Sequence, residues 1–379
     1  MYLYQKTGIF FAQTAEDIRD LAAAELSELG AGEIRPGYGG IHFHADSKTL
    51  YRINYNARLV SRILAPLASF YCPTPDHLYR HALRIKWTDF FAVNKTFAVF
   101  SNVSNSRISH SHFAALRLKD AVADSFMRQA GTRPDVDTKN PDVTLNLFIH
   151  ADRATISLDT SGKALHYRGY RKHAVSSPMR ETVAAAMIRI SEWDGSLPLY
   201  DPMCGSGTIL AEALMAYCRI PSGWIRPHFG FERLPDYDAR IWKNVRTECR
   251  QQIRDLPEGL IGGSDISGKA VAISSANLGL LPGGGQVSLH TTDFSDIAAL
   301  RNHVIITNPP YGIRMNKNEN LDPFFKNLGD FLKQRCAGST AYVYFGNREW
   351  IKKIGLRPSL KKPLQTGGLD GRLVKYEMY

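Results

Sequence analysis

The sequence predicts an α/β protein whose C-terminal part forms a parallel sheet covered by helices. Patterns typical of helices and strands alternate from Met179 onward, through ETVAAAMIRI, LPLYD, TILAEALMAYC, GLIGGSDI, VSLHTTDF, HVIITNPPYG and AYVYFG. Such alternation is typical of a parallel sheet. Two of the predicted strands also lead into loops of unusual composition, one rich in glycine and one rich in proline.

We expect three segments along the chain. Residues 1–65 predict a small α+β unit, in which EDIRDLAAAELSELG and residues 48–64 have helical spacing, and YLYQKTGIFFAQT and GGIHFHA resemble strands. Residues 66–162 predict a strand at FAVFSNVS, a hairpin in VTLNLFIHADRATISLD, and between them a helix closed by Gly131. A basic linker, KALHYRGYRKHAVSSP, opens the third segment, residues 163–379.

The composition favours a polyanionic partner. The 379 residues include 47 Lys and Arg against 36 Asp and Glu, a net charge of +11. A chain this basic suggests binding to nucleic acid, although a solvated basic surface explains the charge equally well.

The cysteines and the N-terminus indicate the compartment. Five cysteines, at positions 72, 204, 218, 249 and 336, form no C-x-x-C pair, so neither a zinc site nor a disulfide framework is predicted. The N-terminus has no leader-like segment, and no apolar run approaches the length of a membrane span. We therefore expect a cytoplasmic protein with no membrane or metal partner.

The stretch from Asp201 to Thr208, DPMCGSGT, joins a short apolar strand to a helix. Gly205 and Gly207 let the backbone turn sharply and approach a ligand closely. The pattern is neither G-x-x-x-x-G-K-[ST] nor a full G-x-G-x-x-G, because Leu210 stands at the third glycine position. We therefore expect the amino-acid end of a compact cofactor here, although the loop alone fits a plain strand-to-helix turn as well.

Two aspartates follow the next predicted strands. Asp265 in GGSDIS is placed to accept hydrogen bonds from ribose hydroxyls, and Asp293 in TTDF to accept one from an adenine amine. Either residue could instead be a helix N-cap.

The most specific motif is Asn308-Pro309-Pro310-Tyr311-Gly312, directly after the strand HVIIT. Ligands bind at the carboxyl ends of strands in open α/β sheets. The Asn308 side-chain oxygen and the Pro309 carbonyl are two acceptors, and the prolines contribute no competing N–H groups. Tyr311 can stack on a base that has been flipped out of its helix, although it could also be a core aromatic residue.

This acceptor pair suits the methylation of an exocyclic amine. The lone pair of such an amine is delocalised into the base, which makes the nitrogen a poor nucleophile. Two acceptors that hold its N–H groups favour a pyramidal nitrogen and stabilise the positive charge that develops as it attacks a methyl sulfonium. Alignment supplies the rest, and no metal is needed.

Together, DPMCGSGT, SDIS, TDF and NPPYG resemble the class I methyltransferases that use S-adenosyl-L-methionine (AdoMet). The blocks FFAQTAEDIRDLAAAELSELGAG, YRINYNARLVSRIL, FAALRLKDAVADSF, GTRPDVD, LDTSGKALHYRGYRKHA and FGFERLPDYDARIW resemble the bacterial THUMP-domain guanine-N2 methyltransferases of 23S ribosomal RNA. This resemblance covers nearly the whole chain. It implies a ferredoxin-like region over 1–65, a THUMP RNA-binding domain over 66–162, and a Rossmann-like methyltransferase domain with a mostly parallel seven-stranded sheet over 163–379.

The resemblance also implies roles for single residues. The catalytic residues would be Asn308, Pro309 and Tyr311. The helix that closes the cofactor site would contain Arg180, Glu181 and Thr182. The residues that contact AdoMet would be Thr182, Asp201, Pro202, Cys204, Gly205, Gly207, Thr208, Asp265, Ile266, Asp293 and Asn308. RNA would be bound by Arg107, Lys119, Arg133, Arg168, Arg171 and Lys172. The last three, in the linker, could instead be a solvated surface between domains.

Two departures from the family matter. Ile313 stands where the family usually has Glu after NPPYG, so contacts just beyond the base are in doubt. Some relatives carry a second methyltransferase domain, whereas here we expect one activity. The function predicted is methylation of guanine N2 in 23S ribosomal RNA. The alternatives are a tRNA guanine-N2 methyltransferase and an inactive RNA-binding factor in ribosome assembly.

Overall fold

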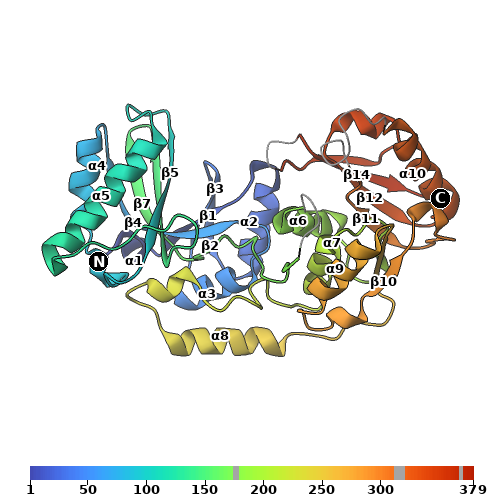
Figure 1. Cartoon of the computed structure of the whole chain (residues 1–379), viewed down its shortest axis with the longest axis horizontal. Helices are drawn as coiled ribbons and strands as arrows, with labels where there is room; N and C mark the ends of the chain where they lie inside the picture. Colours follow the sequence, from blue (N-terminus) through green and yellow to red (C-terminus); the bar gives the residue numbers. More distant parts are fainter. Residues whose placement is uncertain (174–178, 311–320, 367–369) are drawn as a thin grey trace. The chain divides into compact units, whose positions relative to one another are not determined.

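The computed structural model describes residues 1–173, 179–310, 321–366 and 370–379. The chain forms two compact units (Figure 1). The N-terminal unit consists of Met1–Thr14, Ala23–Leu165 and Arg226–Arg246, and the C-terminal unit of Ala15–Ala22, His166–Ile225 and Thr247–Tyr379. A segment from the second half of the sequence, residues 226–246, thus belongs to the N-terminal unit.

The N-terminal unit is built on a seven-stranded sheet with the order β2-β3-β1-β4-β7-β6-β5. The strands are β1 Ile9–Gln13, β2 Gly32–Gly37, β3 Gly40–His44, β4 Arg62–Tyr71, β5 Phe97–Ser104, β6 Val143–His150 and β7 Arg153–Asp159. The helices of this part of the sequence are α1 Leu3–Thr7, η1 Glu16–Ile18, α2 Arg19–Glu28, α3 Ser47–Asn56, α4 Pro75–Ala82, η2 Trp87–Asp89 and α5 Ser111–Ala130. Strands β5 and β6 are parallel, and the other pairs are antiparallel.

Side-chain alternation decides which face of this sheet is covered. Along β6, Val143, Leu145, Leu147 and Ile149 are buried, while the residues between them point to the opposite face. Helices α4 and α5 lie against the buried side (Figure 1). The helix predicted to end at Gly131 and the predicted hairpin of β6 and β7 are both confirmed.

The second predicted helix of the first segment is shorter than expected. It was predicted over residues 48–64, but α3 ends at Asn56, and the strand β4 begins at Arg62. Leu64 pairs with Phe11 of β1 and with Asp159 of β7, so pairing on both sides overrides the helical spacing of the sequence. The predicted boundary between residues 65 and 66 lies inside β4, and the division into three domains stays a prediction.

The N-terminus also differs from expectation at its first residues. Leu3–Thr7 form the short helix α1, where a strand was predicted. Gly8, with φ +65°, ends the helix in the left-handed conformation that glycine adopts without strain. The predicted strand begins only after it, at Ile9.

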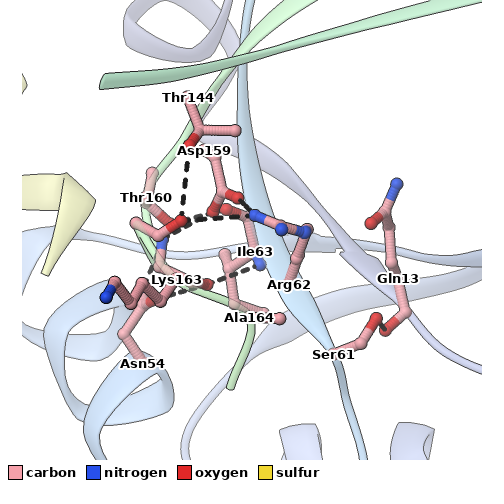
Figure 2. Close-up of polar contacts among 12 residues, drawn as sticks. Gln13, Asn54, Ser61, Arg62, Ile63, Thr144, Asp159, Thr160, Lys163 and Ala164 are labelled. Carbon is pink, nitrogen blue, oxygen red and sulfur yellow. Dashed lines mark hydrogen bonds and ion pairs between the residues drawn. The ribbon is translucent and has the colours of Figure 1, made fainter. Parts of the chain in front are cut away.

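A buried polar network joins α3, β4 and the end of β7 (Figure 2). Asn54 donates from Nδ2 to Thr160 Oγ1 at 3.1 Å, and its Oδ1 accepts from Ser161 Oγ at 3.0 Å. Arg62 forms an ion pair with Asp159, a fully buried residue. Burial raises the pKa of Asp159, and the neighbouring guanidinium opposes that rise. The network satisfies polar groups that would otherwise be costly to bury.

Residues 226–246, which we call the returning segment, are hydrogen-bonded to the chain next to this network. Arg226 donates to the carbonyl oxygens of Ser161 at 2.7 Å, Lys163 at 2.6 Å and Ala164 at 3.0 Å. Beyond it, an aromatic cluster joins α3 to the segment through Tyr51, Tyr55, Phe229, Phe231 and Trp242.

The C-terminal unit contains a second seven-stranded sheet with the order β10-β9-β8-β11-β12-β14-β13. Its strands are β8 Leu199–Asp201, β9 Ile261–Asp265, β10 Ser288–Thr291, β11 Val304–Thr307, β12 Thr340–Phe345, β13 Leu360–Pro363 and β14 Arg372–Glu377. Strands β8 to β12 are mutually parallel, and β14 is antiparallel to both of its neighbours. The predicted Rossmann-like, mostly parallel sheet is confirmed.

The helices of residues 166–379 complete the fold. They are α6 Glu181–Ser191, α7 Thr208–Tyr217, η3 Gly230–Arg233, α8 Ala239–Gln251, α9 Gly268–Leu278, η4 Gly284–Gln286, η5 Phe294–Asp296, α10 Asp322–Arg335 and η6 Arg348–Lys352. Figure 1 shows α6, α7 and α9 grouped on one side of the sheet and α10 on the other. No helix in the described part of the chain is both long and apolar enough to cross a membrane.

Candidate active site

The glycine-rich loop lies at the carboxyl edge of the C-terminal sheet. It follows β8, which pairs in parallel with β9 on one side and β11 on the other, so the loops after all three strands meet at this edge. Gly205 has φ +55° and Gly207 has φ +76°, values that favour glycine. A Cβ on Gly207 would also come within 3.0 Å of Ser274 Oγ. The loop therefore depends on both glycines to bring its backbone close to a ligand.

Side chains of α9 hold this loop in place through hydrogen bonds to its carbonyl groups. Ser274 Oγ donates to the Gly205 carbonyl at 2.8 Å, and Asn277 Nδ2 donates to the Ser206 carbonyl at 3.1 Å. Asn277 also accepts through Oδ1 from the backbone N–H of Lys172 at 3.1 Å, which ties the linker to the loop. Our sequence reasoning missed both α9 residues. The available signal was the pair of polar residues, in SSANLGL, on the buried side of an otherwise apolar helix.

Asp265 lies at the end of β9, next to the glycine-rich loop. Its Oδ2 accepts from the Gly205 N–H at 3.0 Å, and its Oδ1 accepts from the Ser267 N–H at 2.9 Å. Each oxygen keeps a second lone pair for a ligand hydroxyl. Ile266 follows with 71% of its surface exposed. An exposed apolar side chain beside a carboxylate suits a nucleoside, whose base is apolar on its face and whose ribose is polar.

Asp293 has a structural task in the chain itself. It is the N-cap of η5, and its Oδ1 accepts from the Ser295 backbone N–H at 2.8 Å and from the Ser295 hydroxyl at 2.7 Å. The capping alternative is therefore realised, and a contact with adenine stays a prediction.

Asp201 connects the two loops that the sequence singled out. Its Oδ1 accepts from the Met203 N–H at 3.1 Å and from the Thr307 hydroxyl at 2.7 Å. Thr307 immediately precedes Asn308, so one carboxylate orients both loops. Burial raises the pKa of Asp201 to about 7, although both hydrogen bonds act to lower it. Because only 1% of the residue is exposed, we assign Asp201 an indirect role in cofactor binding.

Asn308 has an acceptor without a donor. Within the described residues, its Oδ1 atom is buried and has no hydrogen-bond partner. Leaving such an acceptor unsatisfied costs about 1–3 kcal/mol, so proteins rarely tolerate one without a reason. An acceptor aligned with the end of β11, two strands from Asp265, is suited to a donor that comes from a ligand.

The other predicted cofactor residues lie in or near the same loops. Pro202, Cys204 and Thr208 are buried, Cys204 with its Sγ 3.7 Å from Ser274 Oγ. Burial raises the pKa of the Cys204 thiol, which therefore stays protonated. Thr182 lies in the first turn of α6. Pro309 follows Asn308 and is buried, whereas Tyr311, Gly312 and Ile313 lie outside the described residues.

The expectation that Arg168 contacts RNA is wrong. Its guanidinium is buried in the C-terminal unit, with Nε 3.2 Å from Glu212 Oε1 and Nη2 3.4 Å from Oε2. The Tyr170 hydroxyl donates to the same Oε1 at 3.3 Å. Arg171 is largely buried as well, and it pairs with Glu181 at 2.8 Å. The alternation of basic and aromatic residues in RGYRK reflects this packing, and neither RNA contact nor a solvated surface explains these two arginines.

The remaining predicted RNA contacts are at the surface or close to it. Lys172 is exposed. Arg107 pairs with Asp152 at 3.4 Å, and Arg133 with Asp124 at 2.9 Å. Lys119 pairs with the adjacent Asp120 at 2.6 Å. Such exposed pairs are weak and can exchange their carboxylate for a phosphate, so these four contacts stay predictions. In the part of the chain that the structure describes, no group of three or more His, Cys, Asp or Glu residues could hold a metal ion.

Models of known protein families match residues in both units. A model of the RMKL-like methyltransferase domain matches residues 168–375, a model of the THUMP domain matches residues 72–159, and a model of the RlmL ferredoxin-like domain matches residues 9–64. The chain belongs to the RMKL-like methyltransferase family. As a member of this family it is an AdoMet-dependent enzyme, as the site predicted.

Individual relatives agree with this assignment. The protein named Putative RNA methyltransferase slr0064, from Synechocystis, is 38% identical over 98% of this chain and 97% of its own length. Ribosomal RNA large subunit methyltransferase K/L from Syntrophotalea carbinolica is 35% identical over 97% of this chain but only 53% of its own length, so this chain spans about half of that relative.

A solved structure of similar fold covers both units. SMU.472, described as a putative methyltransferase complexed with SAH, has a TM-score of 0.85 and 25% identity over 98% of each chain.

The residues at the sheet edge fit the family's cofactor. The loop of Gly205 and Gly207 allows close approach, Asp265 has free lone pairs, and Ile266 offers an exposed apolar side chain. Each matches one part of AdoMet: the methionine end, the ribose and the adenine. When bound, AdoMet supplies an electrophilic methyl group on a positively charged sulfur.

Proposed function

We propose that this chain methylates the exocyclic N2 of a guanine in 23S ribosomal RNA. The observation that carries the proposal is the buried Asn308 Oδ1, which lacks a donor among the described residues and lies one residue after Thr307, the partner of Asp201. The names of the relatives from Synechocystis and Syntrophotalea carbinolica support RNA, and the second supports the large ribosomal subunit. A ribosomal substrate would place the activity in the cytoplasm.

In the proposed reaction, this chain's residues hold the amine. Asn308 Oδ1 and the Pro309 carbonyl accept the two N–H groups of guanine N2, which directs its lone pair toward the methyl donor. The nitrogen that accepts the methyl group supplied by AdoMet would become positively charged, and both acceptors would stabilise that charge until one N–H proton is released to solvent. The Asp201–Thr307 hydrogen bond keeps Asn308 in position relative to the glycine-rich loop. Tyr311 would stack on the flipped base.

We assign cofactor contacts by the same reasoning. The methionine end would lie against the backbone of Pro202, Cys204, Gly205, Gly207 and Thr208, with Thr182 at its open side. Asp265 would accept from the ribose hydroxyls, and Ile266 would pack on the adenine beside Asp293. Arg107, Lys119, Arg133 and Lys172 would contact RNA phosphates.

The test is transfer of labelled methyl from AdoMet by the purified full chain. Unmodified 23S ribosomal RNA and bulk tRNA are offered separately, and the labelled RNA is digested to nucleosides. We expect label in N2-methylguanosine from 23S RNA. Label confined to tRNA would favour the tRNA alternative, and no label with either RNA, despite AdoMet binding, would favour an inactive assembly factor.

A further inference from the structure

On the side of the N-terminal sheet opposite α4 and α5, a set of aromatic side chains gathers around the end of β6, whereas Thr144 and Ser157 on the same side are buried. We name this set the aromatic face: Tyr38, Tyr71, Phe100, Phe148 and His150. The strand register places four of them on one side. Phe148 pairs with Asn102 of β5 and with Thr155 of β7, and His150 pairs with Ser104 and with Arg153. The Thr155 hydroxyl donates to Ser69 Oγ at 3.1 Å, which puts β4 side chains on the same side.

Three of the rings are well exposed, whereas Phe148 and His150 are partly buried. Tyr38 is 64% exposed, Tyr71 57% and Phe100 43%. The buried residues of β6 alternate with Phe148 and His150 and point to the opposite side, where α4 and α5 lie. The aromatic face is therefore not part of the core of the unit.

Three of the rings form a nearly parallel set. The ring centroids of Tyr38 and Phe148 are 6.0 Å apart, those of Tyr38 and His150 5.6 Å, and those of Phe148 and His150 6.1 Å. The angles between ring planes are 23°, 16° and 7°, respectively. A hydrogen bond of 3.0 Å between His150 Nδ1 and Ser104 Oγ helps to orient the imidazole. Tyr38 comes from the turn between β2 and β3, so two distant parts of the sheet combine to build the set.

The surroundings of the rings are polar and cationic. Asn102, Asn146, Thr155 and Ser69 lie between or beside them and offer hydrogen-bond donors and acceptors. The guanidinium of Arg62, which pairs with Asp159, lies 5.6 Å from the Phe100 ring centroid. Arg153, next to His150 in register, is exposed and has no carboxylate partner within residues 1–173, 179–310, 321–366 and 370–379. Flat rings beside a free guanidinium are complementary to bases joined by phosphates.

The charge of the N-terminal unit also suits a nucleic acid. Its residues, 1–14, 23–165 and 226–246, contain 23 Lys and Arg against 16 Asp and Glu. Contacts with phosphates position RNA without distinguishing paired from unpaired bases, so the rings would supply that distinction. Bases within a duplex are stacked on each other, so only unpaired nucleotides can offer their faces to protein rings.

We propose that the aromatic face binds unpaired nucleotides of the RNA substrate by stacking, with Tyr38, Phe148 and His150 as its centre. This inference rests on the proposed RNA substrate. It adds that the N-terminal unit selects single-stranded RNA, whichever nucleotide is methylated.

The test measures binding of the full chain to a fluorescein-labelled single-stranded RNA of about twelve nucleotides, a length within the range that OB-folds bind by stacking. Tyr38→Leu and Phe148→Leu keep an apolar side chain but remove the flat ring. We expect each to weaken binding at least about fivefold, because stacking on one base typically contributes about that much or more. Tyr38→Phe should bind as the wild type does.

A matched control and a second readout separate stacking from general damage. Phe113 on α5 is 50% exposed, an exposed fraction similar to those of Tyr71 and Phe100, but it lies on another surface. Phe113→Leu should therefore leave binding unchanged. In an RNA that contains 2-aminopurine, stacking quenches the fluorescence, and Tyr38→Leu should relieve the quenching while Tyr38→Phe keeps it. Unchanged thermal unfolding and AdoMet binding will show that the variants are folded.

Three results would overturn the proposal: wild-type affinity in both leucine variants, an equal loss in Phe113→Leu, or a wild-type preference for duplex RNA of the same sequence. None of these depends on methyl transfer. Ring-dependent binding of single strands in a protein that makes no N2-methylguanosine would reject the proposed function but keep the aromatic face.

Discussion

At the scale of single residues, the cofactor site depends on carboxylates that already have backbone partners. Asp265 accepts one N–H from the glycine-rich loop and one from Ser267. These bonds fix the direction in which its remaining lone pairs point. A ligand hydroxyl therefore meets an acceptor that is ordered before binding, which limits the entropy lost on association.

Replacing Asp265 should weaken cofactor binding in a measurable way. Asp265→Ala removes charge-assisted hydrogen bonds worth roughly 1.5–3 kcal/mol, so AdoMet affinity in calorimetry should fall about tenfold or more. Asp296→Ala, at an exposed aspartate in η5, is the matched control and should bind as the wild type does. Equal affinity in a folded Asp265→Ala protein would exclude this residue from the site.

Asp201 should make stability depend on pH. The pKa of its carboxyl is about 7 in the folded chain against 3.8 for an ordinary aspartate. Between these values the unfolded chain has released the proton while the folded chain retains it. Stability should therefore fall as pH rises from about 4 to about 7, by up to roughly 1.4 kcal/mol per pH unit from this group.

The variant Asp201→Asn isolates this effect. The asparagine oxygen can still accept from Thr307 and Met203, but it carries no charge at any pH. Denaturant unfolding at several pH values should show a flatter profile for Asp201→Asn than for wild type, whereas Asp296→Asn should keep the wild-type profile. Parallel profiles for all three proteins would contradict the buried, proton-retaining carboxyl.

The sequence predicts residues that lie in motifs better than residues that support them. Gly205, Asp265 and Asn308 stand at strand ends in distinctive patterns, and the structure places them at one sheet edge. Asn277, which holds the loop and the linker, lies in no loop motif, and its position on the buried side of α9 does not reveal its partners, because these come from tertiary packing. Arg168 misled us for the same reason, since a buried arginine and an RNA-binding arginine look alike without their partners.

At the scale of elements, a buried ion pair joins the linker to α7, the helix that follows the glycine-rich loop. Arg168 and Tyr170 both donate to Glu212 on α7, and all three residues are buried. Burial also raises the pKa of the Tyr170 hydroxyl, which stays a donor. Since α7 begins directly after Gly207, this cluster anchors the helix that supports the glycine-rich loop.

Breaking one side of this pair should be costly. Glu212→Leu leaves the Arg168 guanidinium buried without its counter-ion, which should lower the free energy of unfolding by about 3–5 kcal/mol in urea titrations. The double variant Arg168→Met with Glu212→Leu should recover part of that loss, because no isolated charge remains. Asp322→Asn, which removes an exposed partner of Lys353, should cost about 1 kcal/mol or less. A Glu212→Leu protein as stable as Asp322→Asn would show that the pair is not essential.

Element types were more predictable than element ends. Alternation identified β6, and short, continuously buried runs identified β9 and β11. The end of α3 was not predictable in this way. Residues 62–64 continue a helical spacing, but they pair with β1, a contact that a local pattern cannot reveal.

At the scale of the whole molecule, the chain crosses between its units more than once. Residues 226–246 lie within the span of the methyltransferase family model, yet they belong to the N-terminal unit. Trp242 contacts Tyr55 at 5.2 Å and Phe231 at 5.1 Å between ring centroids, both nearly edge to face. The predicted succession of three segments could not reveal this exchange, because segment predictions follow the order of the sequence.

This arrangement predicts how the N-terminal unit responds to a change in the returning segment. Trp242→Ala should lower its stability by about 3–5 kcal/mol, because a large buried ring is lost from the cluster. Thermal unfolding of the full chain should show the transition of this unit at a lower temperature, while AdoMet binding by the C-terminal unit persists. Phe113→Ala, at an exposed ring, is the control. An unchanged transition in Trp242→Ala would mean that the segment adds little to the unit.

The central claim, that Asn308 accepts from the amine that is methylated, is tested most directly by the turnover and cofactor affinity of Asn308→Ala. Its Oδ1 has no donor to lose among the described residues, so the variant should fold normally and bind AdoMet nearly as well as wild type. Methyl transfer to 23S RNA should fall about 100- to 1,000-fold, while Asn308→Asp, which keeps an acceptor oxygen, should retain more activity than Asn308→Ala. Wild-type turnover by Asn308→Ala, or a loss explained wholly by weaker AdoMet binding, would contradict the account.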